Sequence, residues 1–345
     1  MQSGIAVNWA NFFPEGSRIV AIPDWKRPRL FVAAQSRVVR WRASTLFPAT
    51  TLLARVRRWL LRGWAQVPGQ MRQSHAPYFL RTRLPEMWDH NALPVAALLG
   101  TPGPAQKLVV QFADTNGITV GYMKFGESPS AMRRLEQEFR VLTDLPKGMG
   151  PEALKLEKIG TGLGLFLSAL QGSPLPGRIA PSAQTMALLY RFQNGAEPIP
   201  VHEHPWLQRA LRAYPAAAPW IEMLESRPWP LATIHGDLAP WNILTGPHGL
   251  HCVDWEYGAL DGFIGVDAAH HVLQTAFLLK GWTPEKARLK STDWLSQKME
   301  FEPREAEAVV RLTALMARHE SLTDGHAADA PLQKWRYKVW GELCG

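Results

Sequence analysis

One polar segment limits what this chain can fold into more than any other feature. Residues 234–256 interrupt a series of helical patterns and bring Asp237, Asn242 and Asp254 close together in the sequence. Short apolar runs flank a glycine-containing turn at residues 246–249, a pattern that predicts a β-hairpin. Such a hairpin would place Asn242 and Asp254 side by side at its open end.

These three side chains suit phosphoryl transfer. An Asn carbonyl and an Asp carboxylate are hard oxygen ligands of the kind that Mg²⁺ binds together with substrate phosphates and waters. Asp237, five residues before Asn242, could then accept the proton of a substrate hydroxyl. In the alternative interpretation the three residues only cap and shape turns, as Asp and Asn often do. Their order and context favour the catalytic interpretation.

The patterns on either side of this segment predict an α+β chain. The predicted strands cover residues 94–99, 107–113, 118–125 and 163–170. The first three are most simply antiparallel, and a helix from Ser128 to Pro146 follows them. Helical patterns dominate the second half of the chain and cover residues 181–194, 204–225, 265–280, 284–298, 303–320 and 331–343.

The loop His235-Gly-Asp237-Leu-Ala-Pro-Trp-Asn242, followed after the hairpin by Asp254-Trp-Glu256, resembles a known pair of motifs. They are the catalytic loop and metal-binding segment of the aminoglycoside phosphotransferase and choline kinase family, protein-kinase-like enzymes that phosphorylate small molecules. Protein kinases have His-Arg-Asp and Asp-Phe-Gly at these places, and this sequence follows the small-molecule version at both. The resemblance implies a two-lobed protein-kinase-like α+β fold, with a small antiparallel-sheet N-lobe and a larger, mainly helical C-lobe.

The resemblance also implies the chemistry, an ATP-dependent and Mg²⁺-dependent phosphotransferase with an alcohol group of a small molecule as acceptor. Asp237 is then the expected catalytic residue, and Asn242 and Asp254 are the expected metal ligands. His235 is expected to support the loop rather than act as a base, because Asp237 already fits that role. Asp267, in Gly-Val-Asp, resembles the buried aspartate that supports the backbone of the catalytic loop in this family.

The nucleotide site that the resemblance implies lies in the strand-rich region. A kinase needs a lysine on its third strand and a glutamate on the next helix to hold that lysine. Lys124 ends the third predicted strand, and Glu138 on the following helix is expected to pair with it, with Glu136 as the alternative. Ser168 and Leu170 lie in the segment that resembles the hinge between the lobes, and their backbone groups are expected to contact adenine.

The phosphate loop is where the sequence departs from kinases. Residues 100–104 read Gly-Thr-Pro-Gly-Pro and lack the G-x-G-x-x-G pattern. A non-catalytic scaffold that keeps the kinase fold and binds a membrane or a partner protein is therefore the rival function. The intact Asp237, Asn242, Asp254 and Lys124 argue against it.

The basic charge of the chain is concentrated at its start. Residues 1–90 carry 14 Lys and Arg against 4 Asp and Glu, a net charge of +10, whereas the whole chain of 345 residues has +8. Strand patterns occur at 18–22, 30–34 and 37–41, and residues 51–67 show a basic amphipathic helical pattern. This segment could serve packing alone, an anionic membrane surface or an acidic partner protein. No motif supports a nucleic-acid partner.

We therefore expect three regions: a basic, Arg- and Trp-rich N-terminal extension (1–90), a strand-rich nucleotide-binding N-lobe (91–170), and a helical C-lobe with the catalytic loop and substrate site (171–345). Two cysteines are too few for a disulfide-stapled secreted scaffold. No apolar run reaches the roughly 18 residues that a membrane span needs. We expect a cytoplasmic protein, peripheral at the membrane where the extension binds lipid.

The acceptor is not chosen by the fold, since the same core serves aminoglycosides, choline, sugars and amino alcohols in the family. A sugar or glycoconjugate suits the many Arg and Trp residues, because Trp stacks on sugar rings and Arg pairs with phosphate. An aminoglycoside or amino-alcohol kinase is the alternative. A polycationic antibiotic would need an acidic cleft, which the basic extension does not support.

Two histidine pairs are interpreted as structural. His270 and His271 are adjacent within a predicted helix and therefore point to different faces, and His202-x-His204 lacks a third ligand in the sequence.

Overall fold

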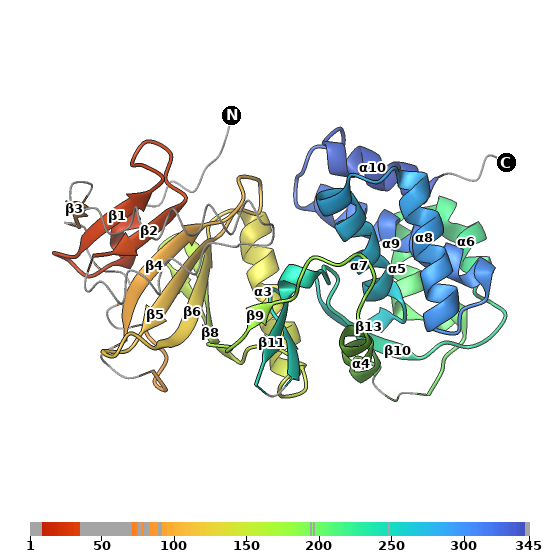
Figure 1. Ribbon diagram of the computed structural model, residues 1–345, viewed down its shortest axis with the longest axis horizontal. Helices are drawn as coiled ribbons and strands as arrows, with labels where there is room; N and C mark the ends of the chain where they lie inside the picture. Colours follow the sequence, from red (N-terminus) through yellow and green to blue (C-terminus); the bar gives the residue numbers. More distant parts are fainter. Residues whose placement is uncertain are drawn as a thin grey trace. The chain divides into compact units, whose positions relative to one another are not determined.

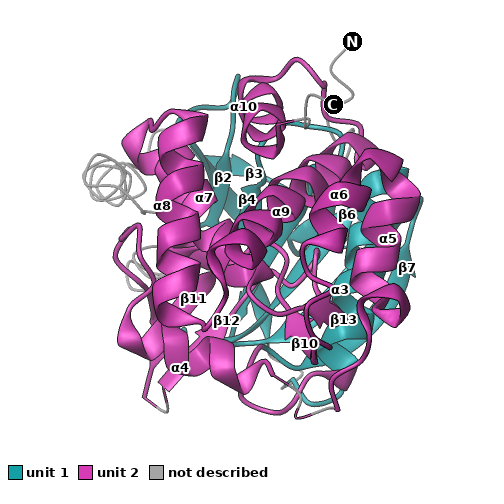
Figure 2. Cartoon of the chain, turned by 90° about the vertical axis from the view of Figure 1, so that its right-hand side faces the viewer, with its two compact units in different colours: residues 1–143, 151–170 teal, residues 144–150, 171–345 magenta. Residues whose placement is uncertain are grey.

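The computed structural model describes residues 9–34, 71–74, 78, 80, 83–88, 92–193, 195, 197–247 and 249–341. The chain divides into two compact units (Figure 2). Unit 1 comprises residues 1–143 and 151–170, and unit 2 comprises residues 144–150 and 171–345. Unit 1 is built on an antiparallel sheet and unit 2 is mainly helical, which confirms the predicted α+β class.

Unit 1 contains an eight-stranded sheet in the order β3-β1-β2-β4-β5-β6-β8-β7, with every neighbouring pair antiparallel (Figure 1). Its strands are β1 (Arg18–Ile22), β2 (Leu30–Ala33), β3 (Met71–Gln73), β4 (Leu93–Leu99), β5 (Leu108–Ala113), β6 (Thr119–Gly126), β7 (Ala153–Ile159) and β8 (Gly162–Ser168). A short 3-10 helix, η1 (Trp9–Phe12), precedes β1, and helix α3 (Pro129–Asp144) follows β6.

The described strands of the basic extension are part of this sheet, because β2 pairs with β4. Side chains of the extension outside these strands also share the core of the sheet. The ring of Phe12 lies 5.0 Å from that of Phe125, and the ring of Trp88 lies 4.9 Å from Phe112 and 5.8 Å from Phe166. The strand predicted at 37–41 and the basic helix predicted at 51–67 lie outside the described residues.

Strand β7 was not predicted from the sequence. It reads Ala-Leu-Lys-Leu-Glu-Lys-Ile and lies at one edge of the sheet. Charged side chains are typical of edge strands because they discourage pairing with other chains. The same charges hide the strand from a search for apolar runs.

Unit 2 holds the remaining helices. They are α4 (Ala183–Arg191), η4 (Val201–Glu203), α5 (Pro205–Ala213), η5 (Pro215–Ala217), α6 (Ala218–Glu222), η6 (Pro240–Asn242), α7 (Val266–Lys280), α8 (Pro284–Lys298), α9 (Pro303–Thr323) and α10 (Pro331–Trp340). Helices α7 to α10 contact one another, and α9 buries the largest number of side chains among them. In the part of the chain that the structure describes, no helix is long and apolar enough to cross a membrane.

The single helix predicted over 204–225 was wrong. Helix α5 ends at Ala213, and a 3-10 turn and a short α6 follow. Proline has no N–H to donate and clashes with the preceding turn. Pro215 and Pro219 therefore each begin a new turn.

Two small antiparallel sheets complete unit 2. One consists of β9 (Ser173–Pro174), β11 (Ile243–Gly246) and β12 (Gly249–Cys252), and the other of β10 (Leu231–Ile234) and β13 (Ala259–Phe263). Strands β11 and β12 pair from Ile243 with Cys252 to Gly246 with Gly249. This confirms the predicted hairpin.

Candidate active site

The loop after β10 is held by a buried aspartate at the start of α7. Asp267, 3% exposed, accepts hydrogen bonds from the backbone N–H of His235 to Oδ2 (2.7 Å) and from that of Gly236 to Oδ1 (2.9 Å). Burial raises the pKa of Asp267, while His235 and the two amides favour its charged form. Gly236 has φ +77°, and a Cβ there would collide with the carbonyl oxygen of Tyr257. Only glycine can therefore occupy this position without moving the backbone of the loop.

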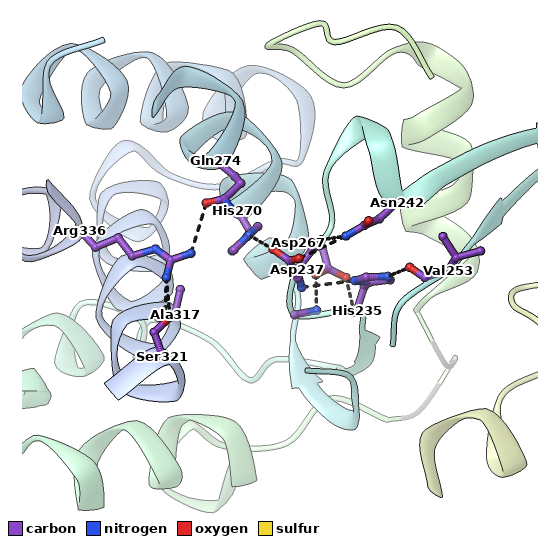
Figure 3. Close-up of polar contacts among 11 residues, drawn as sticks. His235, Asp237, Asn242, Val253, Asp267, His270, Gln274, Ala317, Ser321 and Arg336 are labelled. Atoms are coloured by element: carbon purple, nitrogen blue, oxygen red, sulfur yellow. Dashed lines mark hydrogen bonds and ion pairs between the residues drawn. The ribbon is translucent and has the colours of Figure 1, made fainter. Parts of the chain in front are cut away.

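His235 joins this loop to the hairpin (Figure 3). Its Nδ1 accepts a hydrogen bond from the backbone N–H of Asp237 (3.3 Å), so the proton of the neutral ring is on Nε2. Nε2 then donates to the carbonyl oxygen of Val253 (2.9 Å). Because both ring nitrogens are engaged with backbone, His235 supports the loop, as the sequence predicts.

Asp237 presents its carboxylate between two polar side chains. His270 Nε2 lies 2.9 Å from Oδ1, and Asn242 Nδ2 donates to Oδ2 (3.2 Å) and to the Asp237 carbonyl (2.9 Å). The Asp237 side chain is 27% exposed. A carboxylate oxygen can accept more than one hydrogen bond, so each oxygen can still receive a substrate hydroxyl.

Asn242 and the residue before Asp254 are joined at the open end of the hairpin. The backbone N–H of Val253 donates to the carbonyl of Asn242 (2.9 Å). Since the Asn242 amide nitrogen is turned to Asp237, its Oδ1 is the atom that can serve as a metal ligand. Asp254 has φ +73°, an unusual conformation for a residue other than glycine. An amide oxygen and a carboxylate here fit a hard cation such as Mg²⁺.

Lys124 and Glu138, which the sequence pairs, form an ion pair within unit 1. Lys124 Nζ donates to Glu138 Oε1 (2.6 Å) and Oε2 (2.7 Å). The Glu138 side chain is fully buried and that of Lys124 is 12% exposed. Glu136, the alternative partner, is exposed.

The atypical loop between β4 and β5 is folded onto itself and onto helix α3. Gln106 Nε2 donates to the carbonyl of Gly100 (2.9 Å). The Ser128 hydroxyl donates to the carbonyl of Pro104 (2.5 Å) and accepts from the N–H of Ala131 (3.1 Å). The serine that caps α3 thus also fixes the loop.

Ser168 and Leu170, the residues predicted to form the hinge, lie at the end of unit 1. The Ser168 N–H donates to the carbonyl of Glu152 (3.0 Å), and its hydroxyl accepts from the Glu152 N–H (2.8 Å). The Ser168 carbonyl is then the group that it could offer to an adenine. Leu170 is the last residue of the unit.

His270 was not predicted to lie beside Asp237. The sequence spacing of the two residues could have predicted this contact. Asp267 and His270 are three residues apart on α7, so they share one face of the helix. A helix that holds the loop of residues 235–237 through Asp267 therefore also turns His270 toward that loop.

Residues 127–285 match the family model described as "Phosphotransferase enzyme family". A comparison with curated proteins gives no match. The matched residues include Lys124's partner Glu138, the loop with Asp237 and Asn242, and Asp254.

The chain is also similar to several solved structures. A thermostable mutant of aminoglycoside phosphotransferase APH(4)-Ia, in complex with ADP and hygromycin B, is 15% identical, with 72% of this chain and 94% of that chain covered and a TM-score of 0.45. An ethanolamine kinase from Plasmodium vivax is 11% identical, with 71% and 80% covered and a TM-score of 0.44. Amicoumacin kinase hAmiN, in complex with AMP-PNP, Ca²⁺ and Ami, is 13% identical, with 70% and 87% covered and a TM-score of 0.40.

Proposed function

We propose that this chain, whose residues 127–285 match the phosphotransferase enzyme family, transfers the γ-phosphoryl group of ATP with Asp237 as its catalytic residue. The proposed acceptor is a hydroxyl group of a small molecule. The observation that carries the proposal is the Asp237 carboxylate, partly exposed and held by Asn242 and His270 on a loop fixed by Asp267.

In the proposed reaction the acceptor hydroxyl donates a hydrogen bond to Asp237. Its oxygen forms a bond to the γ-phosphorus of ATP, while the bond from that phosphorus to the β–γ bridging oxygen breaks and its electron pair leaves with ADP. The hydroxyl proton passes to Asp237 and then to solvent. Asp237 mainly orients the hydroxyl in line with the leaving group, since phosphoryl transfer requires positioning more than covalent catalysis.

Asn242 Oδ1 and the Asp254 carboxylate are the proposed metal ligands. Bound there, Mg²⁺ would neutralise charge on the phosphates and bridge them to the protein. Two observations support this assignment: the Asn242 amide nitrogen is already committed to Asp237, and the hairpin joins Asn242 to the residue preceding Asp254. Both groups are hard oxygen donors.

Lys124, held by Glu138, is the proposed ligand of the α- and β-phosphates. The ion pair fixes the position of the ammonium group. The Ser168 carbonyl and the Leu170 N–H are proposed to bind the adenine edge.

A sugar or glycoconjugate is the proposed acceptor, with an aminoglycoside or amino alcohol as the alternative. The support is compositional: the chain has 15 Trp, and its basic excess is confined to residues 1–90. We also propose that this extension contacts an anionic membrane surface or an acidic protein. Electrostatic attraction of this kind weakens as salt screens it.

The test compares the wild type with Asp237→Asn. Calorimetric titration with ATP and Mg²⁺ measures nucleotide binding, and ADP release measures turnover over a panel of sugars, amino alcohols and aminoglycosides. We expect Asp237→Asn to bind ATP as the wild type does and to lose at least about 100-fold in kcat, the scale of a lost general base. A wild type that binds no ATP would overturn the proposal in favour of the non-catalytic scaffold.

A further inference from the structure

Three polar side chains lie on one face of helix α7. Asp267, His270 and Gln274 follow one another at intervals of three and four residues, which places them in a line along the helix. Each reaches a group outside the helix: Asp267 the loop amides, His270 the carboxylate of Asp237, and Gln274 the guanidinium of Arg336 (Figure 3). A buried polar face on a helix is costly unless its groups are paired.

The geometry of the contact between His270 and Asp237 indicates which ring nitrogen carries the proton. Nε2 lies 2.9 Å from Oδ1, and the His270 side chain is 5% exposed. An ionised carboxylate only accepts hydrogen bonds, so the proton is on Nε2 of His270. Asn242 donates to the other oxygen from the opposite side. The carboxylate is therefore fixed by a donor at each oxygen.

The far end of the same helix face is fixed as well. Arg336 on α10, 7% exposed, donates to Gln274 Oε1 (3.2 Å), Ser321 Oγ (2.9 Å) and the carbonyl of Ala317 (3.0 Å). These three acceptors are neutral. Burial lowers the pKa of Arg336, and the negative charge of Asp237 acts in the opposite direction. Arg336 thus joins α7, α9 and α10 next to the catalytic loop.

We propose that His270 is a positioning residue for Asp237: its Nε2–H holds Oδ1 so that the carboxylate is aimed at the acceptor hydroxyl, and Gln274 and Arg336 hold the helix that carries it. The inference rests on the proposed function of Asp237. His270 gives up no proton in the reaction and touches neither ATP nor acceptor. Its contribution is to kcat, because a misdirected carboxylate cannot orient the hydroxyl in line.

The chain offers a matched set of variants. His270→Leu removes the donor at similar volume, and His270→Gln restores an N–H at about the position of Nε2. His271, the next residue, is also buried, and its Nε2 lies 3.2 Å from the carbonyl oxygen of Arg178. His271→Gln is therefore a control for altering a buried histidine of α7 that does not contact Asp237.

The kinetic test measures ADP release with the acceptor that the panel identifies, or with water as acceptor when the panel identifies none. We expect His270→Leu to lower kcat by about 10- to 100-fold, with the Kd for ATP and Mg²⁺ within about twofold of the wild type. His270→Gln should recover most of the loss, and His271→Gln should keep the wild-type kcat. A kcat for His270→Leu equal to that of His271→Gln would overturn the inference.

A spectroscopic test needs no acceptor. Long-range ¹H–¹⁵N correlation spectra of the whole chain should show a protonated Nε2 whose signal is absent in His270→Gln and shifted in Asp237→Leu. In His271→Gln it should remain in place. A His270 protonated only at Nδ1, or one unaffected by Asp237→Leu, would contradict the proposal. If Asp237→Asn turns over like the wild type, the proposed function fails; if Asp237→Asn is inactive while His270→Leu keeps full kcat, only this inference fails.

Discussion

The ammonium group of Lys124 donates to both carboxylate oxygens of Glu138, and the Glu138 side chain is fully buried. A bidentate contact of this kind holds the lysine in one position. It also couples strand β6 to helix α3, so that the fold of unit 1 and the location of the proposed phosphate-binding charge depend on the same pair.

Loss of Glu138 should therefore affect both stability and nucleotide binding. Removing one partner of a buried ion pair typically costs about 3–5 kcal/mol, because the other charge is left desolvated. The slight exposure of Lys124 favours the lower end, and we expect Glu138→Ala to reduce the free energy of unfolding by about 3 kcal/mol. Urea denaturation and ATP titration measure the two effects. The exposed Glu136→Ala is the control, and equal losses in the two variants would refute the pairing role.

The Ser128 hydroxyl should hold the loop between β4 and β5. In Ser128→Ala, α3 loses its cap and the loop loses its bond at Pro104. We expect a loss of about 1 kcal/mol in the free energy of unfolding. Backbone amides of residues 100–107 should also exchange faster with deuterium, while Ser130→Ala leaves their exchange unchanged. Unaltered exchange in Ser128→Ala would show that the loop is held by other contacts.

His271 should make the protein sensitive to mild acid. Burial lowers the pKa of His271 to about 4 from 6.5, so below pH 6.5 the unfolded chain takes up a proton that the folded chain resists. The contribution of His271 to the free energy of unfolding is therefore fully present above pH 6.5 and decreases as the pH falls toward 4. At pH 5 the loss is about 2 kcal/mol. Between pH 7 and pH 5 the free energy of unfolding should fall by about 2 kcal/mol less in His271→Gln than in the wild type. Denaturation curves at the two pH values measure both falls, and equal falls would contradict the prediction.

Asp254 combines an unusual backbone with a proposed metal ligand. A left-handed conformation costs a residue with a Cβ about 1–2 kcal/mol, whereas glycine adopts it freely and Asn tolerates it. We expect Asp254→Gly and Asp254→Asn to be more stable than Asp254→Ala by about 1 kcal/mol or less. Asp254→Gly and Asp254→Ala should lose Mg²⁺-dependent ATP binding, whereas Asp254→Asn, which keeps an amide oxygen, should only weaken it. Unchanged binding in Asp254→Gly or Asp254→Ala would show that Asp254 is not a metal ligand.

Local motifs were the predictable part of this protein. The hairpin of β11 and β12 follows from a glycine turn between apolar runs, and the loop residues Asp237 and Asn242 lie within a few positions of each other. Glu138 is preferred to Glu136 because it precedes the sequence Phe-Arg-Val-Leu, which is similar to the pattern that follows the paired glutamate in the family that the sequence resembles.

Features that depend on tertiary context were missed. Strand β7 has an edge-strand composition whose charges conceal it, and α5 is separated from α6 because Pro215 and Pro219 each begin a new turn. To predict the contact of His270 with Asp237, one must know that α7 holds the loop of residues 235–237 through Asp267. No short pattern states such a relation, since the two residues are 33 positions apart.

The continuity of the sheet from β3 to β7 has a consequence for the lifetime of the chain in a cell. A proteolytic cut that released residues 1–90 would uncover the pairing edge of β4 and the aromatic rings of Phe112, Phe125 and Phe166. An exposed strand edge beside an apolar face is a template for aggregation. The basic extension is therefore part of the folded unit. Without it, the remaining chain would keep every residue proposed for catalysis, but we expect it to aggregate or be degraded.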